Sequence, residues 1–333
     1  MEKTAAGVVG LGSMGTGWHC ETLSRLEQFD LVAGCDPSAE RRALCEQQFG
    51  LTGYDSYDEM LGRDDLDLVV VATPSAMHHD HVIQALRAGK HVVCEKPFCM
   101  NLAECDEMIA AAEQSGKLLS AYQNRRWDGN HLSALHTVRS GLLGEIFFTK
   151  QVSMSYSAIM RTYGVPEFRP QWRAEKRYGG GLLYDFGPHN IDALLQLLGH
   201  PPVRDVYADL RGRLWSDEVD DCCLVVIRFE NGVTSQVETT TVARLGFGGT
   251  LIVGRDGAYL NGTIKVGEGD EEREFETKQF ERDWDAFYLS IHAHLTEGEP
   301  VAIPLSETRQ LMAIIDAALR SAETGQVIAL SDR

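Results

Sequence analysis

A glycine motif near the start of this 333-residue chain constrains the fold more than any other feature. Residues 6–9 predict a buried strand, residues 10–15 follow as G-x-G-x-x-G, and residues 16–26 predict a helix. In such a unit the first glycine permits a tight turn, the second lets a pyrophosphate approach the backbone, and the third lets helix and strand pack closely. We therefore expect a dinucleotide-binding unit, with an ordinary glycine turn as the alternative.

The second predicted strand indicates which dinucleotide such a unit binds. Residues 31–35 form this strand and end at Asp36, 21 residues after Gly15. A carboxylate at this place accepts hydrogen bonds from an adenosine ribose and repels a 2′-phosphate, so it favours NAD. Arg41 and Arg42 follow closely, and an arginine could instead receive that phosphate, so NADP stays possible.

The alternation of strands and helices continues to about residue 124. Further strands are expected at 66–72, 91–95 and 118–122, and helices at 56–61, 79–88 and 101–115. Strands that are apolar throughout are typical of a parallel sheet that is covered on both faces. We expect a doubly wound Rossmann domain over residues 1–124. Its ligand crevice lies at the carboxyl ends of the strands, which places Thr73, His78, Lys96 and Gln123 near one edge.

Glu95-Lys96-Pro97 directly follows one of these strands. A lysine at a strand end, beside a cofactor, can hold a substrate oxygen and stabilise negative charge that develops on it. The proline fixes the backbone after the lysine and permits a cis peptide bond. A solvated surface lysine is the alternative.

Residues 125–333 predict a different architecture. The expected helices are 130–139, 187–198, 284–296 and 306–323, and the expected strands are 146–156, 203–214, 222–229, 233–242, 250–254 and 258–260. This order favours an α+β domain, an open and mostly antiparallel sheet with helices on one face, whose final helix could pack back on the first domain. The uncovered face could pair with another subunit, so we expect a homodimer or homotetramer. Residues 160–178 form an irregular stretch, for which a functional loop and a structural lid are both open.

Three glycines at 179–181 precede a stretch that carries Asp185, His189 and Asp192. Pro188 is tolerated only in a first helical turn, so the helix should begin between Asp185 and Gly187. If Asp185 is already helical, it lies one turn from His189. A histidine beside a carboxylate is a common way to place a general base at a cleft. A capping aspartate and a satisfied surface histidine are the alternative.

Composition narrows the function classes. The formal net charge of −18 argues against general binding to nucleic acid or to anionic membranes. No apolar run reaches about 18 residues, so no membrane span is expected, and the immediate strand at the start leaves no room for a signal peptide. The eight cysteines form no C-x-x-C pair, which favours a reduced, cytoplasmic protein without structural zinc. We expect no metal, since His78, His79 and His81 do not share one helix face.

Several motifs together resemble a known family. They are G-x-G-x-x-G at 10–15, T-P-S-A-M-H at 73–78, A-G-K-H-V-x-x-E-K-P at 88–97, and G-G-(x)3-D-x-G-x-H at 180–189. On these motifs nearly the whole chain resembles the Gfo/Idh/MocA family of sugar and polyol oxidoreductases, which includes inositol dehydrogenases. N-R-R-W-D at 124–128 and W-R at 172–173 look like the subgroup that includes scyllo-inositol dehydrogenases. Ser75 stands where the family often has asparagine, and Asp36 is unlike the serine-rich segment of the NADP-dependent inositol enzymes.

The resemblance implies hydride transfer between nicotinamide and a secondary alcohol of a sugar, anhydrosugar or cyclitol. Lys96, Asp185 and His189 would be the catalytic set, with His189 as the base. Further substrate contacts would be Arg126, Tyr156 and Trp172. The cofactor contacts would be Gly10, Leu11, Gly12, Ser13, Met14, Gly15, Asp36, Thr73, Pro74, Ser75, His78, Glu95, Lys96, Gln123, Trp172 and Arg173. Two alternatives remain open: a glycoside hydrolase that oxidises its substrate transiently, and a non-catalytic NAD-binding regulator.

Overall fold

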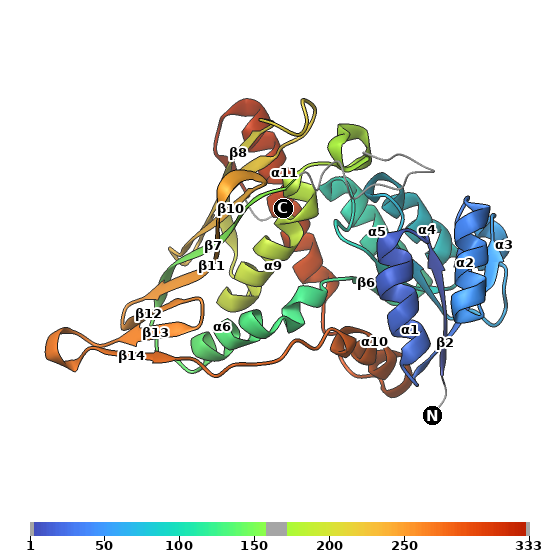
Figure 1. Cartoon of the computed structure of the whole chain (residues 1–333), viewed down its shortest axis with the longest axis horizontal. Helices are drawn as coiled ribbons and strands as arrows, with labels where there is room; N and C mark the ends of the chain where they lie inside the picture. Colours follow the sequence, from blue (N-terminus) through green and yellow to red (C-terminus); the bar gives the residue numbers. More distant parts are fainter. Residues whose placement is uncertain (1–2, 158–171, 331–333) are drawn as a thin grey trace.

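The structure is a computed structural model that describes residues 3–157 and 172–330 and contains two sheets (Figure 1). The first sheet is parallel, with six strands in the order β3-β2-β1-β4-β5-β6. Its strands are β1 (Thr4–Val9), β2 (Phe29–Cys35), β3 (Thr52–Tyr54), β4 (Leu68–Val71), β5 (His91–Cys94) and β6 (Leu119–Ala121). The order reverses between β1 and β4, which is where doubly wound sheets bind ligands. The predicted Rossmann sheet is confirmed.

Helices bury both faces of this sheet. They are η1 (Gly15–Cys20), α1 (Glu21–Arg25), α2 (Ala39–Phe49), α3 (Tyr57–Leu61), η2 (Ser75–Met77), α4 (His78–Arg87) and α5 (Leu102–Ser115). Alternate residues of β4 enter different core clusters: Val69 and Val71 join the one with Met108 of α5, and Leu68 and Val70 join the one with Leu23 of α1. All four β4 side chains are buried, which explains their continuous apolar run.

Two predicted helix starts have the expected caps. The Ser56 hydroxyl accepts a hydrogen bond from the N–H of Glu59 at the start of α3. At the start of α5, Asn101 accepts from the N–H of Glu104 and donates its own amide to the Glu104 carboxylate. The helix after the glycine motif differs from the expectation, because its first part, η1, has π-helical hydrogen bonding. Such wide turns often occur at functional sites.

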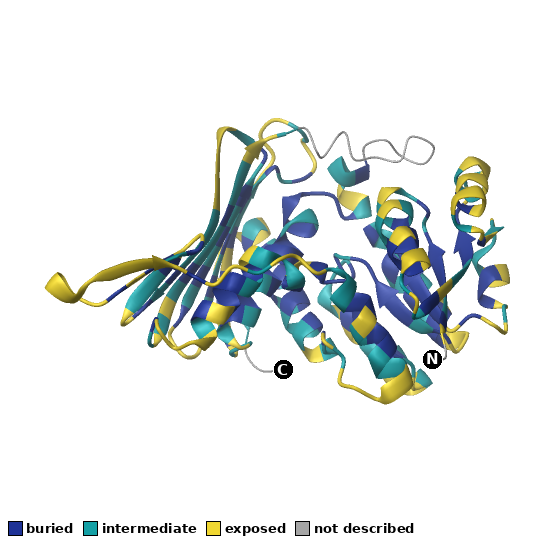
Figure 2. Ribbon diagram, turned by 60° about the horizontal axis from the view of Figure 1, so that its bottom comes forward, coloured by how far each residue is buried: buried dark blue, intermediate teal, exposed yellow. Residues whose placement is uncertain are grey.

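The second sheet has nine strands in the order β14-β13-β12-β11-β7-β10-β9-β8-β15. They are β7 (Ile146–Tyr156), β8 (Val203–Arg211), β9 (Cys222–Phe229), β10 (Thr234–Thr240), β11 (Val242–Gly254), β12 (Gly257–Leu260), β13 (Thr263–Val266), β14 (Arg273–Glu276) and β15 (Ile328–Ala329). All neighbouring strands in this sheet are antiparallel except β7 and β10, which are parallel. The sheet is open, as predicted, and Figure 2 shows its far end, with β14, exposed.

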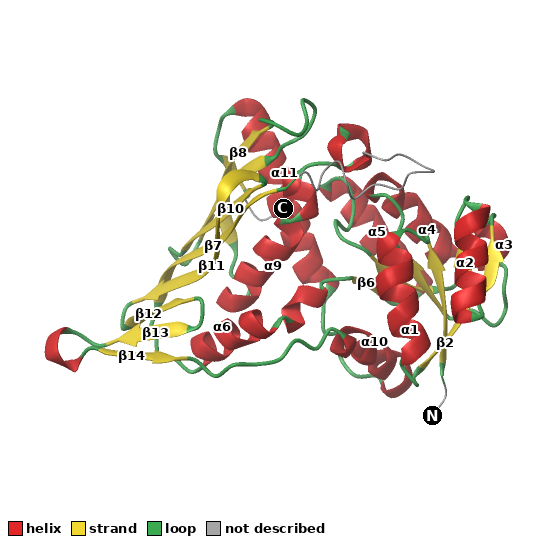
Figure 3. Cartoon of the chain, viewed as in Figure 1, coloured by secondary structure: helices red, strands yellow, loops and turns green. Residues whose placement is uncertain are grey.

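Helices cover one face of this sheet (Figure 3). They are α6 (Gly129–Arg139), α9 (Gly187–Leu198) and α11 (Leu305–Thr324). Along β9 the buried side chains alternate with half-buried ones, and Val225 and Ile227 face the helices. Leu224 and Val226 therefore lie on the opposite face, which no helix of the described chain covers.

The last two helices return to the first sheet. Phe287 and Tyr288 of α10 (Asp285–Glu297) join the core cluster of β1 and β4. Helix α11 contacts α5, and Arg309 on α11 forms an ion pair with Asp106 on α5. The domain boundary expected at residue 124 falls in η3 (Asn124–Trp127) and stays a prediction.

Two strand bounds were predicted incorrectly. Strand β8 ends at Arg211 instead of residue 214, and β11 begins at Val242 instead of 250. The stretch 242–249 contains three glycines, which lower strand propensity, but it pairs with β7 through a register shift. None of the helices described here is long and apolar enough to cross a membrane.

Candidate active site

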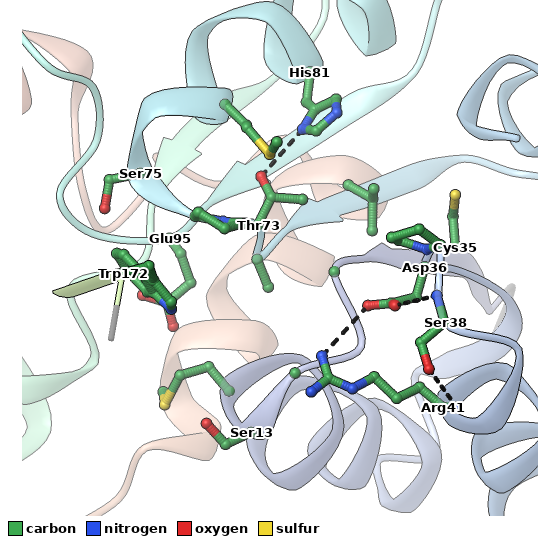
Figure 4. A pocket seen from close by; sticks show the side chains of 18 of the residues that line it. Ser13, Cys35, Asp36, Ser38, Arg41, Thr73, Ser75, His81, Glu95 and Trp172 are labelled. Carbon is green, nitrogen blue, oxygen red and sulfur yellow. Dashed lines mark hydrogen bonds and ion pairs between the residues drawn. The ribbon is translucent and has the colours of Figure 1, made fainter. Parts of the chain in front are cut away.

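A cavity of about 550 Å³ lies at the carboxyl ends of β1, β2, β4 and β5 (Figure 4). Most of the residues predicted to bind a cofactor line it: Gly10, Gly12, Ser13, Met14, Asp36, Thr73, Pro74, Ser75, Glu95, Lys96, Trp172 and Arg173. Figure 4 shows Asp36 and Arg41 at one end and Glu95 and Trp172 at the other. The cavity therefore occupies the crevice that the strand order predicts.

Two glycines of the motif permit close backbone contacts. Gly10 has a φ of +90°, and a Cβ on it would lie 2.6 Å from the carbonyl oxygen of Ala72. A Cβ on Gly15 would lie 1.8 Å from the carbonyl oxygen of Gly10, so η1 packs directly on the turn. Larger residues at these positions would block the turn that forms the cavity floor.

Asp36 connects the glycine turn to the end of β2. Its two carboxylate oxygens accept hydrogen bonds from the N–H groups of Leu11 and Ser38, each at 2.9 Å. The guanidinium of Arg41 lies 3.9 Å from the same carboxylate and also lines the cavity, whereas Arg42 donates to the Asp36 carbonyl. A carboxylate and an arginine thus stand together where an adenosine ribose is expected.

Four of the predicted cofactor residues do not line the cavity. Leu11 contributes its N–H to Asp36, and Gly15 contributes helix packing. The imidazole of the buried His78 lies 2.8 Å from the carbonyl oxygens of both Thr73 and Pro97, so it ties two strand-end loops together. Gln123 is buried, and its Oε1 has no partner among the described residues.

Lys96, at the carboxyl end of β5, reaches across to α8 (Leu182–Asp185). Its Nζ donates to the Asp185 carboxylate at 2.8 Å and to the Asp185 carbonyl at 2.9 Å. Arg173 donates to the same carboxylate at 3.1 Å. Burial alone would raise the pKa of Asp185, but the charges of Lys96 and Arg173 outweigh it and hold this pKa well below its usual range. Asp185 is therefore ionised and fixes the position of the Lys96 ammonium.

His189 lies in the first turn of α9, beside a second cavity of about 210 Å³. It is 7% exposed, and its Nδ1 has no hydrogen-bond partner among the described residues. Burial lowers the pKa of His189 well below 6.5, and Lys96 and Arg125 lower it further, against the opposing effect of Asp185. The ring is thus neutral at neutral pH, and it forms part of the wall of the second cavity.

The two cavities meet. Both are lined by Met14, Glu95, Lys96 and Arg173. The first extends from this junction to Asp36, and the second extends to Asp185 and His189. A molecule in the second cavity would therefore lie next to one end of a ligand in the first.

The two cavities do not bring together all of the predicted site residues. The helix of His189 begins at Gly187, within the predicted range, and Asp185 belongs to the one-turn helix α8 that precedes it. Arg126 and Tyr156 line neither cavity. Arg126 is buried and pairs with Asp192, whereas Tyr156 is exposed at the end of β7. Trp172 lines the first cavity and not the second.

Several residues that line the second cavity were not predicted from the sequence. They are Trp18, Tyr122, Asn124, Arg125, Phe186 and Trp284. Trp18 follows Met14 by four residues, so the helical period after the glycine motif could have indicated it. Trp284 lies far away in the sequence and arrives with α10, and its ring centroid is 4.6 Å from that of Trp18.

A buried hydrogen-bond chain behind Glu95 was also missed. His19 of η1 contacts the Tyr288 hydroxyl through Nδ1 at 2.6 Å and the Glu95 carboxylate through Nε2 at 3.1 Å. The other Glu95 oxygen accepts the N–H of Lys96. Burial acts to raise the pKa of Glu95, but His19 and Lys96 outweigh it and lower this pKa. Glu95 is thus held at the junction of the cavities as a carboxylate.

Comparison with known proteins agrees with this architecture. Residues 4–123 match the model of the oxidoreductase family with an NAD-binding Rossmann fold, and residues 131–260 match the GFO/IDH/MocA C-terminal domain. The structure resembles that of an NAD-binding protein from Listeria innocua, with a TM-score of 0.88 and 29% identity over 98% of this chain and 97% of the other.

Three relatives illustrate the range of the family. The uncharacterized oxidoreductase C115.03 of Schizosaccharomyces pombe is 33% identical over 68% of this chain, and the match spans 60% of its own length. D-glucoside 3-dehydrogenase of Escherichia coli is 29% identical over 97% of this chain and 96% of its own length. The NADP-dependent scyllo-inositol 2-dehydrogenase IolW of Bacillus subtilis is 25% identical over 99% of this chain and 97% of its own length. The chain belongs to the Gfo/Idh/MocA family of oxidoreductases.

Proposed function

We propose that the protein is an NAD-dependent dehydrogenase that oxidises a secondary alcohol of a sugar, anhydrosugar or cyclitol. One observation carries the proposal: Lys96 and His189 line a small cavity that joins the cavity of the dinucleotide motif. An alcohol held between a cation and a neutral imidazole has the groups that its oxidation requires.

The roles follow from the charges and contacts of these residues. His189 is neutral at neutral pH, so it can accept the hydroxyl proton as the carbon–oxygen double bond forms. Lys96 donates to the reacting oxygen and stabilises negative charge on it. Asp185 holds the Lys96 ammonium through two hydrogen bonds, and it keeps Arg173 at the junction of the cavities.

The residues of the first cavity fit a nicotinamide dinucleotide. Gly10 leaves space for the turn, and Asp36 stands at the end of β2 with its carboxylate held by two N–H groups. A nicotinamide dinucleotide held by these residues would supply the hydride-transfer chemistry, and Met14, Glu95, Lys96 and Arg173 line the junction with the second cavity. We infer a preference for NAD from the Asp36 charge. Arg41 lies beside Asp36, and its positive charge would favour a 2′-phosphate, which supports a lower activity with NADP. One relative is named as NADP-dependent.

The names of two relatives, a D-glucoside dehydrogenase and an inositol dehydrogenase, support a polyhydroxylated substrate. Two tryptophans and several charged groups line the second cavity, a mixture that suits the apolar and polar faces of a sugar ring. None of these names points to a hydrolase, and the convergence of Lys96 and His189 argues against a purely regulatory role.

The test is a screen of initial rates of reduced nicotinamide formation, with inositols, aldoses and anhydrosugars and with each cofactor. We expect a substrate that reduces NAD in the wild type and fails to do so with His189→Ala. Tight NAD binding without turnover on any member of the panel would count against the proposal.

We also propose that the uncovered face of the nine-stranded sheet joins two copies of the chain. Tyr207, Leu224 and Val226 lie on this face, and Tyr207 is paired with Val226 across the strands. Val226→Glu should convert an oligomer to monomers in light scattering after size exclusion; an unchanged mass would argue against this face.

All eight cysteines are unpaired, which supports a reducing cytoplasmic setting.

A further inference from the structure

Arg125 lies in the wall of the second cavity, and its charge is not neutralised by any described residue. It is exposed, and within residues 3–157 and 172–330 its guanidinium forms no ion pair or hydrogen bond. Its one described contact is with the ring of Phe186, whose centroid is 6.0 Å from the guanidinium carbon. A guanidinium at this place has most of its five N–H donors available to a ligand.

The other charges of this cavity have partners. Glu95 is held by His19 and by the N–H of Lys96. Asp185 is paired with Lys96 and Arg173. The lining therefore has three cations, Lys96, Arg125 and Arg173, against the two carboxylates. In a chain with a formal net charge of −18, this small cavity has an excess of positive charge.

We propose that the substrate carries an anionic group, a carboxylate or a phosphate ester, and that Arg125 binds it. The inference rests on the proposed function and names the substrate class more narrowly, as an acidic sugar or an acidic polyol. Planar guanidinium groups bind carboxylates and phosphates through two parallel hydrogen bonds, which are stronger than those between neutral groups. An alcohol near His189 and an anion near Arg125 would fix the orientation of one ligand in the cavity.

The aromatic wall of the cavity supports a ring-shaped ligand. Trp18 and Trp284 both line the cavity, and their rings are in contact. The indole N–H of Trp284 donates to Asp128 at 2.8 Å, which fixes this ring. Aromatic surfaces in ligand sites cover apolar faces, and the few polar groups set orientation. Arg125 is then the group that distinguishes an acidic ligand from its neutral parent.

The test measures binding directly, so it does not depend on turnover. Protein saturated with NADH, the proposed ligand of the first cavity, is titrated calorimetrically with D-glucuronate, D-galacturonate and glucose 6-phosphate, and with the neutral parents glucose and galactose. We expect at least one anionic probe to bind about tenfold or more tightly than its parent. The uronates and the phosphate ester distinguish the two kinds of anion.

Three variants assign the effect to the residue. Arg125→Gln should remove the preference for the anionic probe, and Arg125→Lys should retain part of it. Arg282→Gln is the matched control. The guanidinium carbon of Arg282 lies 4.4 Å from the ring centroid of Trp284, but Arg282 does not line the cavity. This variant should keep the preference for the anionic probe.

The inference is overturned if no anionic probe binds more tightly than its parent, or if Arg125→Gln keeps the preference. This outcome differs from failure of the proposed function. A protein that reduces NAD with neutral polyols and ignores anions refutes only the inference. A protein that selects anions through Arg125 but never transfers hydride refutes only the dehydrogenase proposal.

Discussion

The ammonium of Lys96 donates to two oxygens of Asp185, the carboxylate at 2.8 Å and the backbone carbonyl at 2.9 Å. The two residues come from different parts of the fold. Lys96 follows β5 of the parallel sheet, whereas Asp185 is the last residue of α8, which packs near the second sheet. Both side chains are 12% exposed, so the pair is largely shielded from water. The contact therefore joins the two halves of the chain at the point where the two cavities meet.

Lys96→Met tests the role of this ammonium. The side chain keeps its length but loses its charge and its donors, so stabilisation of the reacting oxygen is lost. We expect kcat to fall by about 10²- to 10³-fold, the usual cost of removing one such donor. Lys265→Met is the control, since Lys265 forms an exposed ion pair with Glu272 far from the cavities. Equal rates for the Lys96 and Lys265 variants would remove Lys96 from the mechanism.

The pH dependence of the oxidation tests His189 as the base. A base acts when neutral, and the pKa of His189 is lowered from 6.5, so kcat/KM should fall only at pH values well below 6.5. The Asp185 charge raises this pKa, so Asp185→Asn should move the acid limb to still lower pH. Lys96 lowers the pKa, so Lys96→Met should move the limb to higher pH. Identical acid limbs in all three proteins would contradict the assignment.

Asp36→Asn tests the basis of cofactor choice. Asparagine keeps an oxygen for one of the two N–H groups but loses the negative charge that repels a 2′-phosphate. Arg41, 3.9 Å from the Asp36 carboxylate, lines the same cavity and adds a positive charge that attracts such a phosphate. We expect the ratio of kcat/KM for NAD to that for NADP to fall about tenfold or more. The exposed Asp64→Asn is the control, and an unchanged ratio in the Asp36 variant would refute the assignment.

Arg126→Ala should destabilise the protein rather than alter substrate affinity. Arg126 is buried, pairs with both oxygens of Asp192 and contacts Glu307 at 2.7 Å. Removing it leaves the buried Asp192 carboxylate without its arginine partner, so the free energy of unfolding should decrease by about 3–5 kcal/mol. Urea denaturation measures this decrease. Arg309→Ala, which removes an exposed bidentate pair with Asp106, should cost at most about 1 kcal/mol. Equal effects would contradict this account.

The first sheet could be predicted because its signals are local. The glycine motif, apolar strands such as β4 and caps such as Asn101 each depend on a few neighbouring residues. The strand order then follows from the fold class, and it places Lys96 at the ligand edge without knowledge of any contact.

Contacts between distant segments could not be predicted in this way. Arg126 was expected to meet substrate, but its partners, Asp192 and Glu307, arrive on α9 and α11 and bury it. Trp284 enters the second cavity only because α10 packs against the first sheet. Sequence patterns indicate which face of an element is buried, but they do not indicate which distant element buries it.

The most direct test of the central claim follows the hydrogen atom itself. A carbon-deuterated form of the substrate found in the screen is incubated with the protein and NAD, and the reduced cofactor is analysed by mass spectrometry. The account predicts one deuterium in the reduced nicotinamide for each alcohol oxidised, and none with His189→Ala. Conversion of the substrate without net reduced cofactor, with the deuterium returned to the product, would contradict a dehydrogenase and favour transient oxidation.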